Sequence, residues 1–134
     1  MKFLLDTHAL LWWMDGSEAL GASRRTLIED PGNDILVSIA SLWEIVIKVQ
    51  VGELESDIDE IITTKDVQGI RVLHIQPAQF NVLARLPRFH KDPFDHLLIA
   101  QAMVEGATLM SEDRQMALYP AARIRCSDEP AGAQ

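Results

Sequence analysis

The sequence predicts one α/β domain whose mostly parallel sheet is covered by helices on both faces. Short apolar runs of strand length alternate along the chain with longer segments that have helical spacing. The apolar runs are nearly continuous, which is typical of strands buried on both sides. The 134 residues, 48% of them hydrophobic, are enough to bury one core.

Five segments are predicted to be strands. Four are short apolar runs that lead into turn or helix-start residues, and the fifth is a candidate edge strand. In chain order they are KFLL (2–5), DILVS (34–38), RVLHI (71–75), ATLMS (107–111) and ARIRC (122–126).

Six segments are predicted to be helices. Ser17 is a candidate N-cap, Pro77 suits the first position of a helix, and Gly52, Gly69 and Gly106 suit positions just after a helix end. The expected helices span residues 7–14, 17–29, 39–50, 58–67, 77–86 and 95–105.

The segment IASLWEIVIKVQ (39–50) is apolar nearly all round, apart from one polar line formed by Ser41, Glu44 and Lys48. We therefore expect a largely buried helix. A surface pair between Glu44 and Lys48 is worth only about 0.3–0.5 kcal/mol. Removing a carboxylate from water costs several kcal/mol. Either a metal ion or a fully bonded Lys48 would have to hold Glu44.

Composition limits the cellular setting and the kind of partner. The formal net charge of −8 argues against a broad cationic surface for nucleic acid. The single cysteine, Cys126, cannot form an internal disulfide, and no apolar run reaches the roughly 18 residues of a membrane span. We expect a cytoplasmic protein with one domain over residues 1–126 and a disordered tail, SDEPAGAQ (127–134).

Acidic residues stand where the predicted fold would gather them. Asp6 follows the first strand and Asp113 the fourth, so both belong to the rim formed by the carboxyl ends of parallel strands. Each also has a simpler explanation, as a helix cap or a turn residue. Asp92 and Asp95 flank Pro93 and Phe94, and one N-cap suffices there. Asp92 is the better cap or supporting group, and Asp95 is the better candidate for the rim.

The convergence of Asp6, Glu44, Asp95 and Asp113 would create a carboxylate pocket without histidine or cysteine ligands. Such a set favours Mg²⁺ or Mn²⁺ over zinc. Bound in this way, a hard cation can lower the pKa of water and orient a phosphodiester. No glycine-rich phosphate loop and no GxSxG motif offers another catalytic site.

At these residues the sequence resembles the PIN-domain ribonucleases, and in particular the VapC-type toxins of prokaryotic toxin–antitoxin pairs. The resemblance extends from Met1 to about Arg125. Its segments are LLDTHALLWW (4–13), SIASLWEIVIKVQVGEL (38–54), HKDPFDHLLIAQA (90–102) and TLMSEDRQM (108–116).

The resemblance implies a three-layer α/β/α sandwich and a metal-dependent endoribonuclease that acts as the toxin of a type II toxin–antitoxin module. Asp6, Glu44, Asp95 and Asp113 match the family's acids, which hold Mg²⁺ or Mn²⁺ while a bound water attacks RNA. Ser111 matches the family's hydroxyl, with Asp92 and Lys48 as supporting groups. A cognate antitoxin and a second copy of the chain are the implied protein partners.

Candidate RNA contacts lie around the acid pair. Arg85, Arg88, His90 and Lys91 precede it and could hold phosphates, although a solvated surface explains them equally well. His96 stands where many relatives carry arginine, and it is either an RNA contact or a partly exposed helix residue. Trp12 and Trp13 point about 100° apart on a helix and cannot fill the same core site.

Three other functions are open at this stage. A metal-dependent phosphatase of the haloacid-dehalogenase type would need a second aspartate two residues after Asp6, where His8 stands. A receiver domain would need an acceptor aspartate after the third strand, and RVLHIQP (71–77) has none. A PIN-like domain that binds RNA without cutting it is the third alternative.

Overall fold

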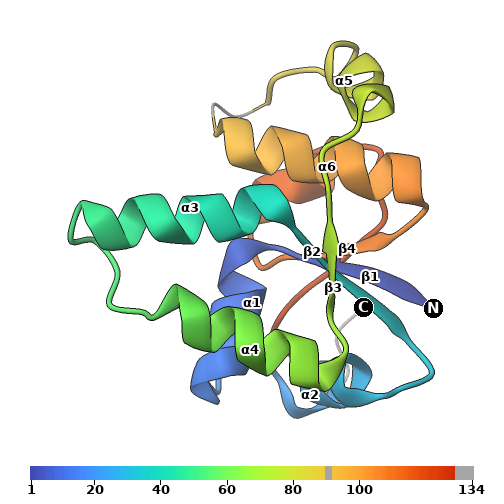
Figure 1. Cartoon of the computed structure of the whole chain (residues 1–134). Helices are drawn as coiled ribbons and strands as arrows, with labels where there is room; N and C mark the ends of the chain where they lie inside the picture. The colour runs from blue at the N-terminus through green and yellow to red at the C-terminus, as the bar shows by residue number, and fades with distance from the viewer. Residues whose placement is uncertain (90–91, 129–134) are drawn as a thin grey trace.

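The computed structural model describes residues 1–89 and 92–128 and contains one five-stranded parallel sheet of order β3-β2-β1-β4-β5 (Figure 1). All five predicted strands are confirmed, with the later ones shorter than expected. Their bounds are β1 Lys2–Leu5, β2 Asp34–Ser38, β3 Arg71–Leu73, β4 Thr108–Met110 and β5 Arg123–Ile124.

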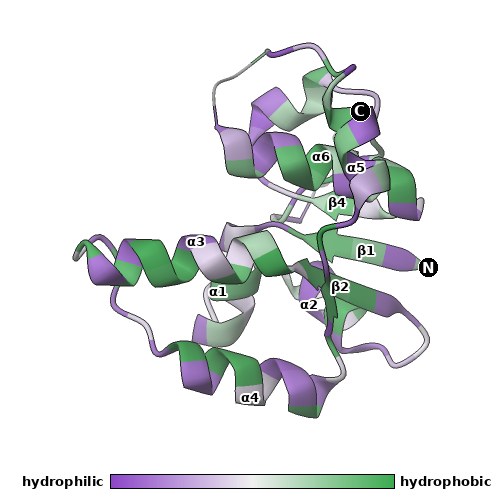
Figure 2. Ribbon diagram, turned by 45° about the horizontal axis from the view of Figure 1, so that its top comes forward, coloured by the Kyte–Doolittle hydropathy of each residue, from purple (hydrophilic) through white to green (hydrophobic). Residues whose placement is uncertain are grey.

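Strand β1 lies at the centre of the sheet, where Leu4 is in register with Leu36 on one side and Leu109 on the other. These three residues belong to one buried core, while Phe3 and Leu5 belong to a second core on the opposite face. Consecutive side chains of a strand point to opposite faces, which is why the apolar runs are continuous. Figure 2 shows this hydrophobic centre along β1 and β2.

Helices cover both faces of the sheet, as expected for an α/β/α sandwich (Figure 1). One core joins the sheet to α1, α2, α3 and α4, and the other joins it to α6, on which α5 packs. The helix bounds are α1 Thr7–Asp15, α2 Ala22–Glu29, α3 Ile39–Gln50, α4 Ile58–Gln68, α5 Pro77–Leu83 and α6 Pro93–Glu105, and a short 3₁₀ helix, η1, spans Arg114–Leu118.

Three helix boundaries differ from the sequence prediction by more than one residue. Helix α5 ends three residues early, at Leu83, and α6 begins at Pro93 because Asp92, not Asp95, is its N-cap. Helix α2 begins at Ala22 instead of near Ser17. The Ser17 hydroxyl instead accepts a local bond from the Ala19 amide at 3.1 Å. Buried Leu20 then separates this turn from the helix.

The start of α2 is capped by a residue from the far end of the described chain. Asp128 accepts from the Ser23 amide at 3.2 Å and from the Ser23 hydroxyl. A Cβ atom on Gly21 would lie 2.6 Å from the Asp128 amide nitrogen, so glycine leaves the room that this contact needs. Asp128 and Ser127, whose hydroxyl donates to Glu112 at 2.7 Å, belong to the predicted disordered tail and contact the domain. Residues 129–134 lie outside the described part.

The expectation that α3 is buried nearly all round is wrong. Its Ala40, Leu42 and Ile45 are buried, but Trp43 is 61% exposed. The side of α3 that carries Trp43 forms a groove of about 600 Å³ with α5 and α6. This apolar groove is lined by residues that include Trp43, Ile47, Phe80, Leu83, Phe94 and Leu97.

Among the described residues, no helix is long and apolar enough to cross a membrane.

Candidate active site

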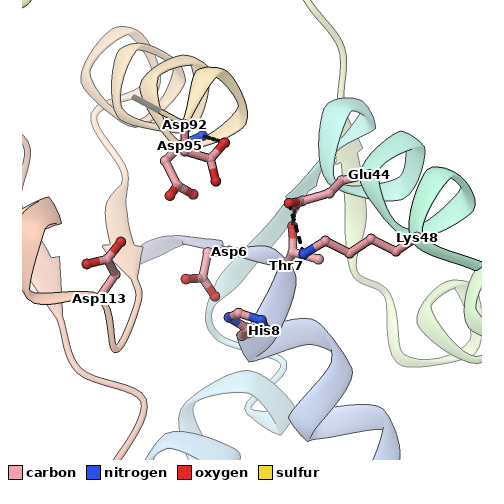
Figure 3. Close-up of a pocket in the computed structure, with 8 residues that line it drawn as sticks. All are labelled: Asp6, Thr7, His8, Glu44, Lys48, Asp92, Asp95 and Asp113. Atoms are coloured by element: carbon pink, nitrogen blue, oxygen red, sulfur yellow. Dashed lines mark hydrogen bonds and ion pairs between the residues drawn. The ribbon is translucent and has the colours of Figure 1, made fainter. Parts of the chain in front are cut away.

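The four acids singled out in the sequence line one pocket at the carboxyl ends of the central strands (Figure 3). Asp6 comes from the end of β1, Glu44 from α3, Asp95 from α6 and Asp113 from the segment after β4. The pocket has a volume of about 300 Å³. Its lining consists of Asp6, Thr7, His8, Glu44, Lys48, Asp92, Asp95 and Asp113.

Asp6 is both a helix cap and a pocket residue, so the two explanations weighed for it are compatible. Its Oδ1 atom accepts from the Ala9 amide at 2.8 Å, and its own amide donates to the Met110 carbonyl at 3.1 Å. The side chain is only 7% exposed, and this burial raises its pKa. Hydrogen bonds from Ala9 and Ser111 act in the opposite direction and favour the charged form.

Glu44 is held by two neighbours that project into the same pocket. Its Oε2 atom lies 3.4 Å from Lys48 Nζ, and its Oε1 atom accepts from the Thr7 hydroxyl at 2.5 Å. Lys48 therefore supplies part of the compensation that the sequence required. Thr7 was not among the candidate residues, because nothing in the sequence places the first residue of α1 against the second turn of α3.

The two acids at the start of α6 divide the tasks of capping and of lining the pocket. Asp92 Oδ1 accepts from the amides of Phe94 and Asp95, at 2.9 and 3.4 Å. The Asp95 side chain turns toward the other acids (Figure 3). Desolvation, and then the negative charges of Asp92, Asp6, Asp113 and Glu44, raise its pKa to about 8.

Asp113 and Ser111 form a turn at the end of β4. The Asp113 amide donates to Ser111 Oγ at 3.1 Å, and Asp113 Oδ1 accepts from the Gln115 amide at 2.9 Å as the N-cap of η1. Ser111 is fully buried. Its hydroxyl also bonds Asp6, so one side chain links the acids that follow β1 and β4.

The donor set fits a hard divalent cation. Every carboxylate in the pocket offers oxygen atoms, and their mutual repulsion is the kind that a bound cation relieves. Within residues 1–89 and 92–128, no three Asp, Glu, His or Cys side chains already stand in a coordinating cluster. The carboxylates would therefore have to move closer together to share one ion.

The candidate RNA contacts are distributed differently from the acids. Arg85 and Arg88 are exposed, whereas His90 and Lys91 lie outside the described residues. The expectation that His96 is partly exposed is wrong. It is 8% exposed, and its Nε2 atom lies 2.8 Å from the Tyr119 hydroxyl, with the two rings packed edge to face. Tyr119 is itself buried, with 5% of its surface exposed.

His8 is the second pocket residue, after Thr7, that was missed as a candidate. His8 is exposed, lines the pocket and stacks on Trp12 one turn later in α1, with ring centroids 5.6 Å apart. Its place in the sequence, two residues after Asp6, was a usable signal, since both residues belong to the same strand-to-helix turn. Trp13 is buried in the core, so the adjacent tryptophans do occupy different sites.

The chain is similar to proteins of known family and structure. The model of the PIN domain matches residues 3–122. Ribonuclease VapC22 of Mycobacterium tuberculosis (strain ATCC 25618 / H37Rv) is 25% identical over 115 residues, which are 84% of this chain and 88% of the relative.

Solved structures share the fold at lower identity. VapBC2 from Rickettsia felis, bound to a DNA fragment from its promoter, has a TM-score of 0.68 at 16% identity, covering 93% of this chain and 98% of the other. VapBC-1 from nontypeable Haemophilus influenzae has a TM-score of 0.65 at 14% identity, with coverage of 94% and 98%. Since the family model spans nearly all of the described residues, the chain belongs to the PIN-domain family and is a distant homologue of the VapC ribonuclease toxins.

Proposed function

We propose that this protein is a metal-dependent endoribonuclease and the toxin of a type II toxin–antitoxin module. The observation that carries the proposal is the convergence of Asp6, Glu44, Asp95 and Asp113 in one pocket of a PIN domain. The distant relationship to a ribonuclease supports the choice of RNA as substrate.

Asp6, Glu44, Asp95 and Asp113 would hold Mg²⁺ or Mn²⁺, as PIN domains typically do. When bound, such a cation lowers the pKa of water and offsets the charge that develops on phosphate oxygens. The protein's part is to keep the carboxylates oriented. Lys48 and Thr7 fix Glu44, while Asp92 takes over the capping of α6 and so leaves Asp95 free of that task.

Binding of RNA to this acidic protein needs local positive charge. Arg85 and Arg88 are exposed on the segment that leads toward α6, and we propose that they contact phosphates together with His90 and Lys91. His96 packs against Tyr119, and we propose that it influences RNA binding indirectly, by holding the start of α6 in place. Lysine and arginine contacts of this kind make binding weaker as salt concentration rises.

The test is cleavage of structured RNAs by the purified protein with Mg²⁺, with Mn²⁺ and with a chelator. We expect internal cleavage with either metal and none with the chelator. Hydrolysis of small phosphoesters without RNA cleavage would favour the phosphatase alternative. RNA binding without cleavage under every metal condition would favour the non-catalytic alternative.

We also propose that the protein binds a cognate antitoxin in the cytoplasm. We further propose that it forms a homodimer in which the apolar groove is the surface that contacts the second copy. Related structures carry the names of VapBC complexes, and one is described as a member of a family of toxin–antitoxin systems. The groove exposes aromatic side chains beside the pocket, with Trp43 packed edge to face on Phe94. Exposed apolar surface of this kind is typical of protein interfaces.

Replacing Trp43 by Glu should convert a dimer of the purified chain into a monomer. A buried tryptophan at an interface commonly contributes about 2 kcal/mol or more, which corresponds to at least a 30-fold weaker dissociation constant. Sedimentation equilibrium measures this directly. The matched control is Val67→Glu, which changes an 86% exposed residue of α4 outside the groove. Dimerisation that survives Trp43→Glu would exclude this surface.

A further inference from the structure

We propose that His8, supported by Trp12, is a stacking platform for a nucleobase of single-stranded RNA beside the acidic pocket. The inference rests on the ribonuclease function proposed above and assigns a binding role to a residue that the metal site does not use. Its basis is the position of exposed His8, which lines the pocket and stacks on partly buried Trp12.

The two rings form a nearly parallel stack. Their planes differ by 16°, and their centroids lie 5.6 Å apart. His8 and Trp12 are four residues apart on α1, so they lie on the same face of the helix, one turn from each other. The imidazole remains exposed even though one side of it is turned toward the indole.

Trp12 makes the platform rigid. Its side chain is partly buried and packs against the core that joins α1 to the sheet. Helix α1 is itself fixed at its start by the Asp6 cap and at its end by Gly16, whose amide bonds back to the last turn. A ring that stacks on His8 would therefore meet a surface that is already ordered, and little side-chain entropy would be lost.

The platform lies where a base next to the scissile phosphate would reach it. His8 lines the same pocket as Asp6, Glu44, Asp95 and Asp113 (Figure 3). An RNA phosphate over those acids would place the adjoining nucleoside at the rim. Unpaired bases in loops and single strands stack on aromatic side chains in this way, whereas bases inside a duplex are not available.

Charge offers a competing explanation for His8, because an imidazolium near five acids would be attracted to them. Three substitutions separate the two roles. His8→Ala removes both the ring and the charge, His8→Phe keeps a planar ring without charge, and His8→Lys keeps charge without a ring. Since His8 is exposed, all three variants are expected to fold, which thermal melting would verify.

The experiment measures kcat and KM for cleavage of a short single-stranded RNA by the full chain with Mg²⁺. We expect His8→Ala to raise KM by about 5- to 30-fold, with His8→Phe restoring it and His8→Lys failing to do so. His74→Ala, which changes an exposed histidine outside the pocket, serves as the matched control.

A second arm replaces single bases of the RNA by abasic sites. An abasic site at one position next to the cleaved bond should weaken binding of the RNA to the wild-type protein. The same abasic site should not change the affinity of His8→Ala for the RNA. Unchanged KM in His8→Ala, or rescue by Lys and not by Phe, would overturn the stacking role while leaving the ribonuclease function intact. Absence of cleavage by the wild-type protein would overturn both.

Discussion

Asp95→Asn should abolish RNA cleavage and, at the same time, make the metal-free protein more stable at pH 8. Desolvation and the neighbouring acids raise the pKa of the Asp95 carboxyl group to about 8. An amide keeps the shape of the side chain and removes its charge. We expect a loss of activity on the order of 10³-fold, as for other groups that act on the developing charge.

Two measurements check this prediction, namely single-turnover cleavage and thermal unfolding in a chelator. Asp6→Asn should lose cleavage to a similar extent while keeping the N-cap of α1, because asparagine also caps helices well. Glu18→Gln, at an exposed position in the turn before α2, is the control for loss of one negative charge. Wild-type activity in both Asp95→Asn and Asp6→Asn would remove the proposed site.

The second prediction concerns stability as a function of pH. The pKa of Asp95 is about 8 in the folded protein and 3.8 ordinarily, so between these values the folded state retains a proton that the unfolded state has released. The free energy of unfolding should therefore fall as the pH rises from about 4 to about 8 in metal-free solution. Burial raises the pKa of Asp6 as well and acts in the same direction.

Mg²⁺ should reverse this loss and should do so more strongly at pH 8 than at pH 5. At low pH the ion must displace a proton, and at high pH it meets a charged pocket. A ligand at 100 times its dissociation constant stabilises the folded state by about 2.7 kcal/mol. Thermal melts with and without Mg²⁺ at the two pH values, repeated on Asp95→Asn, measure the difference. An equal shift at both pH values would contradict the predicted linkage.

Salt bridges elsewhere act in a separate pH range. Arg71 lowers the pKa of Asp34, through bonds of 2.8 and 3.0 Å, so the stability from this pair is present above the ordinary pKa of Asp34 and is lost in more acidic solution. Asp34 is partly exposed, and its ion pair with Arg71 contributes little to stability. The predicted fall in stability toward pH 8 therefore comes from the acids of the pocket and not from this surface pair.

Much of the fold and part of the site could be predicted because the necessary signals are local. Apolar runs define the strands, and parallel order brings their carboxyl ends to one rim, so Asp6 and Asp113 could be placed there from their neighbours alone. Asp92 could be identified as a cap because Pro93 suits the first turn of a helix.

The features that escaped prediction depend on contacts between distant segments. The bond from Thr7 to Glu44 joins residues 37 positions apart, and buried His96 contacts Tyr119, which is 23 positions away. Trp43 belongs to an apolar segment that looks buried in the sequence, yet it is 61% exposed and lines the groove with residues of α5 and α6. The cap of α2 by Asp128 likewise spans the whole domain.

The central position of β1 has a consequence for how the crowded charges can be tolerated. Asp6 follows the strand that is paired on both sides, and its amide is bonded to β4, so this end of the sheet cannot open without breaking up the domain. The acids therefore cannot move apart by fraying, which is the local opening that relaxes unfavourable contacts at edges and termini. Beyond the ion pair of Glu44 with Lys48, the remaining repulsion among the acids is relieved by uptake of a proton or of a cation, so the rigid sheet favours binding of an ion.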